Sequence, residues 1–280
     1  MVSFKSALDC AKSECIELNI ETTRIEWLMM DLFQWTKVDF IVHMNDEMTS
    51  AQSQQFDVAK SRMLNGEPIQ YIVGYQSFYG ERFKVNNDCL IPRPETEEVM
   101  LHFLEKLNRD DTIVDIGTGS GNIPIMLKKL NTSLKIYATD ISNKALLVAK
   151  ENARQHQVDI KFLEGDALQP LIEQGIKVNG LISNPPYIDR ADATFMEDTV
   201  LSYEPHSALF ANDHGYRVYH DILANLPKVL KPNAQVVFEI GYNQGEILKN
   251  KIQTMYPDLM VSIVQDINNN DRIISFKWHD

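Results

Sequence analysis

The chain has 280 residues, of which 44% are hydrophobic and 24% charged, with a formal net charge of −12 at pH 7. This length exceeds one average domain, and the apolar content is ample for a packed core, so we expect two domains. Residues 1–80 carry six basic and eleven acidic side chains, which leaves no basic arm for phosphate groups. A protein partner therefore suits the charge better than DNA or ribosomal RNA.

Cysteine content and apolar patterning narrow the class further. Cys10, Cys15 and Cys89 are odd in number and lack Cys-x-x-Cys spacing, so the pattern indicates neither a disulfide framework nor a zinc site, and we expect no metal. The N-terminus lacks the apolar segment of a secretion signal, and no apolar run approaches membrane-spanning length. We therefore expect a cytoplasmic protein that makes no membrane contact.

The first eighty residues follow a helical pattern. Phe4–Leu8 opens one predicted helix, a second begins at Thr22 or Thr23 as its cap, and a third runs from about Ser50. The second helix carries an apolar stripe at helical spacing, formed by Ile25, Leu28, Met29, Leu32 and Phe33. We interpret the methionine and aromatic positions of these helices as core rather than as ligand contacts.

A short hairpin and a stiff connector follow the helices. Gln76–Val85 has the pattern of a β-hairpin, and Pro92 and Pro94 restrict the segment after it. Beyond this point strands and helices alternate, which predicts a mostly parallel sheet. The late strands are expected at 235–240, 259–263 and 272–277.

A glycine-rich turn follows the first strand of the predicted sheet. Thr112–Ile116 has the pattern of a buried strand and leads into Gly117–Gly121, Gly-Thr-Gly-Ser-Gly, where a helix begins. Glycines allow close backbone approach, and the first turn of the helix offers unpaired N–H groups, so the turn suits a nucleotide-like cofactor. The third glycine comes one residue earlier than in the dinucleotide fingerprint, which disfavours a dehydrogenase. The alternative is a tight connection without a ligand.

Two further predicted strands end in carboxylates. Asp140 closes the strand at 134–140, about twenty positions past the glycines, where an acid can accept from ribose hydroxyls. It could equally be the N-cap of the next helix. Asp166 follows the strand at 162–164 and can accept from an adenine amino group, with a loop-capping role as the alternative.

The fourth strand ends in Asn184-Pro185-Pro186-Tyr187, directly after the apolar run Gly180–Ser183. Each proline restricts the residue before it, so the Asn184 side chain is aimed. Its amide oxygen and a nearby backbone carbonyl can accept both hydrogens of one planar NH2 group, while Tyr187 packs against the π face. The segment therefore indicates chemistry on an amino nitrogen, although a proline-rich turn is the simpler alternative.

This order of motifs resembles the Rossmann-like S-adenosylmethionine-dependent methyltransferases, and within them the release-factor glutamine methyltransferases, the HemK or PrmC family. Other stretches that match the family are Leu90–Glu97, Gly74 with Ser77–Gly80, Tyr203–Pro205 with Ala208–Phe210, Phe238–Gly241, and Asp271 with Arg272. The match covers nearly the whole chain and is weakest in the first sixty residues. His206 departs from a frequent arginine, and Ala167 stands where a larger residue is often found, which affects details of fit.

The resemblance implies an α/β fold: a Rossmann-like, seven-stranded methyltransferase domain whose last strand is antiparallel, with a small N-terminal helical domain joined by a β-hairpin linker. The expected divisions are a helical substrate-binding domain at 1–72, a hairpin and linker at 73–94, and the methyltransferase domain at 95–280.

The resemblance also implies the activity. A methyl group would pass from S-adenosylmethionine to the side-chain amide nitrogen, N5, of the glutamine in the Gly-Gly-Gln motif of class 1 peptide chain release factors, leaving S-adenosylhomocysteine. Asn184, Pro185 and Tyr187 would be catalytic, and Pro186 would complete the substrate site. The cofactor would contact Gly117, Thr118, Gly119, Ser120, Gly121, Asp140, Asp166, Ala167 and Asn184. We expect a monomer that needs no side-chain general base.

Other functions remain open at this point. The glutamine of a ribosomal protein is the nearest alternative acceptor. Adenine-N6 and guanine-N2 methyltransferases use the same tetrapeptide, but they usually need a basic face or a recognition domain. A non-catalytic adaptor that binds release factors through its helices is a different class, which a cofactor titration would separate from all the enzymes.

Overall fold

A computed structural model, which describes residues 2–279, divides the chain into two units. The first unit holds the residues up to Tyr75 together with Glu197–Tyr203, and the second holds Gln76–Met196 and the chain from Glu204 onward. The first unit has a hydrophobic core of its own, and two further core clusters lie in the second.

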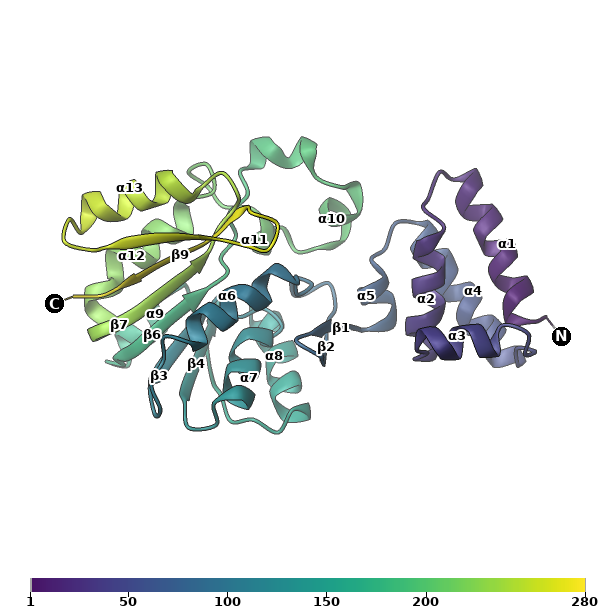
Figure 1. The fold of residues 1–280 in the computed structure, drawn as a ribbon, viewed down its shortest axis with the longest axis horizontal. Helices are drawn as coiled ribbons and strands as arrows, with labels where there is room; N and C mark the ends of the chain where they lie inside the picture. Colours follow the sequence, from purple (N-terminus) through teal and green to yellow (C-terminus); the bar gives the residue numbers. More distant parts are fainter. Residues whose placement is uncertain (1, 280) are drawn as a thin grey trace. The chain divides into compact units, whose positions relative to one another are not determined.

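The first unit is helical (Figure 1). Its elements are α1 (Phe4–Glu17), α2 (Thr23–Phe33), α3 (Lys37–His43), α4 (Ser50–Leu64), α5 (Ile69–Val73) and, from later in the chain, α10 (Asp198–Tyr203). The three predicted helices are confirmed as α1, α2 and α4, and the apolar stripe of α2 lies in or against the core. The sequence did not predict α3, because none of its residues is buried and no apolar stripe marks it, or α5, which has only five residues.

Capping side chains start the helices of this unit. Ser3 accepts from the Ser6 backbone N–H at 3.2 Å, and Thr36 and Thr49 form capping boxes at α3 and α4. Thr22 occupies the N-cap position of α2 but makes no side-chain cap bond there. Its predicted place is therefore correct, while the expected capping contact is missing.

The segment Glu197–Tyr203 returns to the helical unit from far along the chain. The Tyr203 hydroxyl at the end of α10 donates to the Asn65 carbonyl at 3.0 Å. Side-chain carbons of Thr199 and Tyr203 lie 3.7 and 3.8 Å from where a Cβ on Gly66 would stand. The chain therefore passes through the helical unit between two stretches of the other unit.

Within residues 2–279 the second unit contains a seven-stranded sheet of order β5-β4-β3-β6-β7-β9-β8. Its strands are β3 (Thr112–Ile116), β4 (Lys135–Asp140), β5 (Lys161–Glu164), β6 (Val178–Ser183), β7 (Leu230–Glu239), β8 (Val261–Gln265) and β9 (Asp271–Lys277). The first five are parallel, and β9 pairs antiparallel with both β7 and β8. The expected sheet with an antiparallel last strand is confirmed. The hairpin is β1 (Tyr75–Phe78) and β2 (Glu81–Lys84).

Helices cover both faces of the sheet (Figure 1). Alternate strand residues enter opposite clusters: Val236 joins the cluster that contains α12 and α13, whereas Val237 joins the cluster that contains α6 and α7. The helices of this unit are α6 (Glu95–Leu104), α7 (Asn122–Leu130), α8 (Asn143–Gln155), α9 (Gln169–Glu173), α11 (His206–Leu209), α12 (Arg217–Val229) and α13 (Gly245–Met255), with a 3-10 turn at Arg190–Phe195. In the part of the chain that is described, no helix is both long and apolar enough to cross a bilayer.

Candidate active site

A cavity of 360 Å³ opens at the carboxyl ends of the parallel strands. Its wall is built from the segments after β3, β4, β5 and β6, from the connector at 88–90 and from parts of 205–218. The strand order reverses between β3 and β6, so the glycine turn and the Asn-Pro-Pro-Tyr segment flank the switch point of the sheet. Ligands of open α/β sheets bind in this place, and the volume falls within the range of about 300–1,000 Å³ for small-molecule sites.

The three glycines of the turn after β3 serve different purposes. All three have positive φ, with values of 71°, 54° and 79° at Gly117, Gly119 and Gly121. Gly117 and Gly119 line the cavity, and no atom lies within 4 Å of where a Cβ on Gly119 would stand. A Cβ on Gly121 would lie 3.1 Å from the Ala149 Cβ, so this glycine allows α8 to approach. Thr118 and Ser120 are buried and lie off the lining.

Asp140 lies at the end of β4 and fastens the glycine turn. One of its carboxylate oxygens accepts from Gly119 N and the other from Ser142 N, both at 2.9 Å. The N-cap of α8 is Ser142, whose hydroxyl accepts from Ala145 N, so Asp140 is not the cap of that helix. Burial raises the pKa of Asp140. A carboxylate has about four acceptor sites, so Asp140 keeps acceptor capacity for a ligand in the cavity that it lines.

Asp166 and Ala167 line the cavity after β5. The Asp166 backbone carbonyl, rather than its side chain, closes the turn into α9 by accepting from Gln169 N at 2.9 Å, and the α9 cap residue makes no side-chain bond. Ala167 has φ of 44°, and its carbonyl accepts from the Thr139 hydroxyl at 3.0 Å. A small side chain at this left-handed position leaves room in the wall.

Asn184, Pro185 and Pro186 follow β6 and line the same cavity. The Asn184 side-chain nitrogen Nδ2 donates to the Thr96 hydroxyl at 3.2 Å, and that hydroxyl donates to Glu239 Oε2 at 2.6 Å. The Asn184 amide therefore has a hydrogen-bond partner on its nitrogen side.

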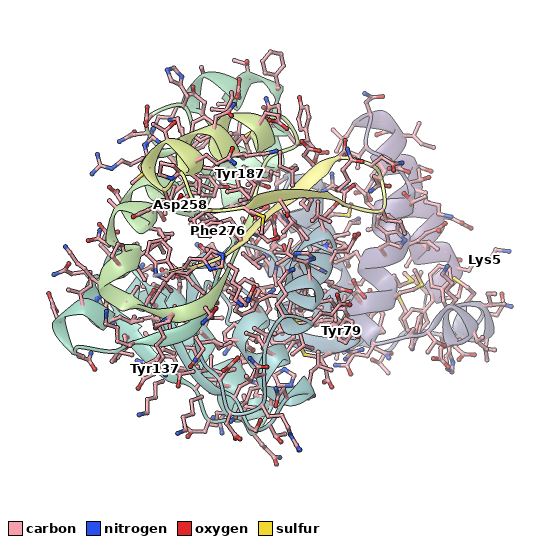
Figure 2. The ribbon with its side chains drawn as sticks, turned by 60° about the vertical axis from the view of Figure 1, so that its left-hand side comes forward. Lys5, Tyr79, Tyr137, Tyr187, Asp258 and Phe276 are labelled. Atoms are coloured by element: carbon pink, nitrogen blue, oxygen red, sulfur yellow. The ribbon has the colours of Figure 1, made fainter. Side chains whose placement is uncertain are left out.

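Tyr187, labelled in Figure 2, lies off the cavity lining. Its ring packs against the core cluster that contains residues of α12 and β7. Its carbonyl accepts from Gln244 Nε2 at 2.9 Å, and a side chain at Gly215 would collide with that same carbonyl. Burial raises the pKa of the Tyr187 phenol well above its usual range. The expected stacking of this ring on a substrate amide stays a prediction.

Several residues of the site were not assigned a role from the sequence. Glu204, with 1% of its side chain exposed, binds Arg93 at 2.5 Å and accepts from Ile91 N at 3.3 Å. It therefore ties the connector to the segment that follows α10. Thr96 and Glu239 were likewise given no role. Glu204, Arg93, Thr96 and Glu239 lie in stretches that match the family, whereas Gln244 and Gly215 do not. A single sequence cannot show which of these residues contact one another.

Asp115, next to the glycine turn, is fully buried. Neither of its carboxylate oxygens has a well-formed hydrogen bond among the described residues. Burial raises its pKa to about 7, and the nearby Thr118 hydroxyl, which lowers the pKa, offsets only part of that rise. The folded pKa lies above the usual 3.8, so the contribution to stability is full below about pH 4 and is lost as pH rises through 7.

We expect Asp115→Asn to be more stable than the parent at pH 8 in ligand-free protein, by a few kcal/mol at most. The difference between the two should shrink steadily between pH 7 and pH 4, because the amide does not titrate. Urea unfolding across this pH range measures it. A difference that does not change with pH would show that Asp115 is not buried as a costly charge.

A larger and more open hollow, of 730 Å³, lies on the helical unit. One side of α4 lines it with Ser50, Ser53, Gln54, Asp57, Val58, Ser61 and Arg62, together with Val2 and Met48. Its lining holds no strand end and no glycine turn. The cavity at the sheet edge is therefore the candidate active site.

The fold and the position of this cavity are those of the Rossmann-like, S-adenosylmethionine-dependent methyltransferases. Comparison with known proteins supports this class. Residues 6–74 match the family model "PrmC N-terminal domain", and residues 95–202 match "Methyltransferase small domain". A release factor glutamine methyltransferase of Staphylococcus aureus is 58% identical over 99% of this chain and 100% of its own, and that of Bacillus subtilis is 36% identical over 100% and 99%. The chain belongs to the release factor glutamine methyltransferase family.

Solved structures agree at the level of the fold. A methyltransferase from Pyrococcus furiosus matches with a TM-score of 0.55 over 80% of this chain and 100% of that one, at 15% identity. The 16S rRNA N2 G1207 methyltransferase of T. Thermophilus, solved with AdoMet and guanosine, matches with a TM-score of 0.50 over 72% and 49%, at 10% identity. These low identities support the architecture alone.

Proposed function

We propose that the chain transfers a methyl group from S-adenosylmethionine to N5 of the glutamine in the Gly-Gly-Gln motif of class 1 peptide chain release factors. The observation that carries the proposal is the placing of Asn184 and Pro185 on the same cavity wall as Gly117, Gly119 and Asp140. The residues suited to bind an amide and the glycine turn suited to bind a nucleotide-like cofactor therefore line the same cavity. The full-length similarity to proteins named for this reaction supports the choice of acceptor.

The lining residues fit the cofactor. Gly117 and Gly119 leave the wall open to a close-lying ligand, Asp140 keeps acceptor sites for ribose hydroxyls, and Asp166 with Ala167 can serve the adenine. Thr118, Ser120 and Gly121, off the lining, would act by shaping the turn. When bound, the cofactor supplies a methyl group on a sulfonium, which is an excellent leaving group. The reaction needs no metal ion in this proposal.

The protein contributes position and electrostatics to the transfer. Asn184 Oδ1 and the Pro185 carbonyl would accept the two N–H bonds of the glutamine and support the positive charge that grows on its nitrogen. Tyr187 would pack near the amide plane and add a cation-π contribution. The methylated nitrogen is acidic and can lose its proton to water. The raised pKa keeps the Tyr187 phenol protonated, so the phenol does not act as a base. The proposal gives His206 no proton-accepting role.

The proposal also assigns the parts of the chain. Residues 1–72 would help to bind the release factor, 73–94 would link, and 95–280 would carry the chemistry, with the protein acting as a monomer. A release factor works with the ribosome, so we place the enzyme in the cytoplasm. The acidic N-terminal segment suits a protein acceptor rather than direct nucleic-acid binding.

The test offers the enzyme and S-adenosylmethionine to four acceptors: a release factor, the same factor with its Gly-Gly-Gln glutamine changed to asparagine, a ribosomal protein, and DNA or rRNA. Mass spectrometry should find one added methyl group on the glutamine of the first acceptor only. Methylation of the ribosomal protein or the nucleic acid at a higher kcat/KM would replace the proposal by that alternative. Calorimetry that detects no cofactor binding would favour the adaptor.

A further inference from the structure

Three side chains from separate parts of the chain meet beside the cavity. Asn184 follows β6, Glu239 ends β7, and Thr96 is the second residue of α6. In the parallel pairing of β6 with β7, Ser183 lies opposite Phe238, so the next residues of the two strands are also neighbours. Thr96 bridges them, at 3.2 Å from Asn184 Nδ2 and 2.6 Å from Glu239 Oε2.

The chemistry of the three groups fixes the direction of these hydrogen bonds. An ionised carboxylate accepts only, so the single hydroxyl hydrogen of Thr96 must point at Glu239. The Thr96 oxygen can then act toward Asn184 only as an acceptor, so it must bind the NH2 group of the Asn184 amide. The amide oxygen consequently faces away from Thr96. A reversed amide would set two acceptors against each other.

Burial makes this arrangement costly to break. Thr96 and Glu239 are each only 2% exposed, so water cannot replace a lost partner. The bridge joins two residues that contact no ligand in the proposed mechanism to a side chain that binds the acceptor amide, because Thr96 and Glu239 lie off the cavity lining and Asn184 lies on it.

We propose that Thr96 and Glu239 are positioning residues, which hold the Asn184 amide with its oxygen turned toward the acceptor glutamine. This inference rests on the proposed function, since it concerns the same methyl transfer. It adds that the orientation of the Asn184 amide, besides its presence, is set by a bridge from α6 and β7.

The state of Glu239 controls the bridge. Burial raises the pKa of Glu239 to about 7, although the hydrogen bond from Thr96 and the charge of Arg272 both lower it. Arg93 also lowers it and Glu95 raises it, while the Tyr187 and Tyr219 phenols nearby stay protonated. Once protonated, Glu239 can donate to Thr96, whose hydrogen is then free for Asn184 Oδ1. The reversed amide becomes allowed, so the methyl-transfer rate should fall as pH drops through about 7.

Two substitutions at Thr96 separate positioning from packing. Thr96→Val keeps the shape and removes the hydroxyl, whereas Thr96→Ser keeps the hydroxyl and removes the methyl group. At pH 8 we expect Thr96→Val to lower the single-turnover rate about tenfold to a hundredfold, in line with losses at residues that orient a ligand-binding group. Thr96→Ser should stay within about threefold of the parent. Cofactor affinity, from calorimetry, should be the same in all three.

A pH profile completes the test, with a release factor shown to be folded at each pH and with pre-bound cofactor. The parent should slow between pH 8 and pH 6, and both Thr96→Val and Glu239→Gln should lose that dependence. A serine variant impaired more than the valine variant would identify Thr96 as a packing residue and overturn the inference. So would a slope that persists in Glu239→Gln. A parent enzyme that never methylates the release factor would instead defeat the proposed function.

Discussion

Asn184→Ala should lower methyl-transfer turnover by roughly a hundredfold or more, by analogy with the loss of one hydrogen-bonding group that acts in a transition state. The substitution removes the acceptor for the glutamine N–H and leaves the glycine turn and Asp140 in place. Cofactor affinity should therefore change far less than turnover. Steady-state kinetics with saturating release factor, together with calorimetry of cofactor binding, measure the two effects.

Asn250→Ala is the matched control for this variant. Asn250 is an exposed asparagine on α13, outside the cavity lining, so the same chemical change there should leave turnover near that of the parent. Near-normal turnover in Asn184→Ala would reduce the Asn-Pro-Pro-Tyr segment to a turn. A thermal unfolding scan of each variant guards against counting loss of folded protein as loss of catalysis.

Asp140→Ala should weaken cofactor binding about tenfold to a hundredfold, because a hydrogen bond to a charged group contributes roughly 1.5–3 kcal/mol. The loss has two sources in the structure. The ribose acceptor disappears, and so does the oxygen that holds Gly119 N at 2.9 Å in the glycine turn.

Asp159→Ala supplies the comparison, since Asp159 is an exposed carboxylate outside the lining and its removal should not change cofactor affinity. Calorimetry on both folded variants decides the matter. Unchanged affinity in Asp140→Ala would mean that Asp140 serves the local backbone alone, through Gly119 and Ser142.

The sequence was a good guide wherever the signal was local. A strand followed by Gly117–Gly121, strands ending in Asp140 and before Asp166, and the Asn-Pro-Pro-Tyr segment all have short-range patterns. Their assembly at one edge follows from the parallel sheet. Local signals also predicted the helices with apolar stripes. They failed for α3, which has no fully buried residue and only Phe40 packed against the core.

The pairings that cross the fold could not be predicted. Thr96 bonds Asn184 and Glu239 across 88 and 143 positions, and Glu204 binds Arg93 across 111. Such contacts depend on how helices and strands pack. From the sequence alone, a mechanism without a side-chain base predicts a rate nearly independent of pH from about pH 6.5 to 9, because no group in Asn-Pro-Pro-Tyr titrates in that range. The structure adds Glu239, which limits the expected flat range to above about pH 8.

The passage of Glu197–Tyr203 through the helical unit bears on how that unit can be studied. A shortened protein that starts after Tyr75 would lose more than the helices that we propose to bind the release factor. It would also remove Asn65 and Gly66, which α10 contacts, and α10 ends directly before Glu204. Poor turnover in such a truncation would not measure recognition. Tyr203→Phe removes the hydroxyl that binds Asn65 and keeps the N-terminal helices. In the intact chain it therefore separates the loss of this α10 contact from the loss of the helices.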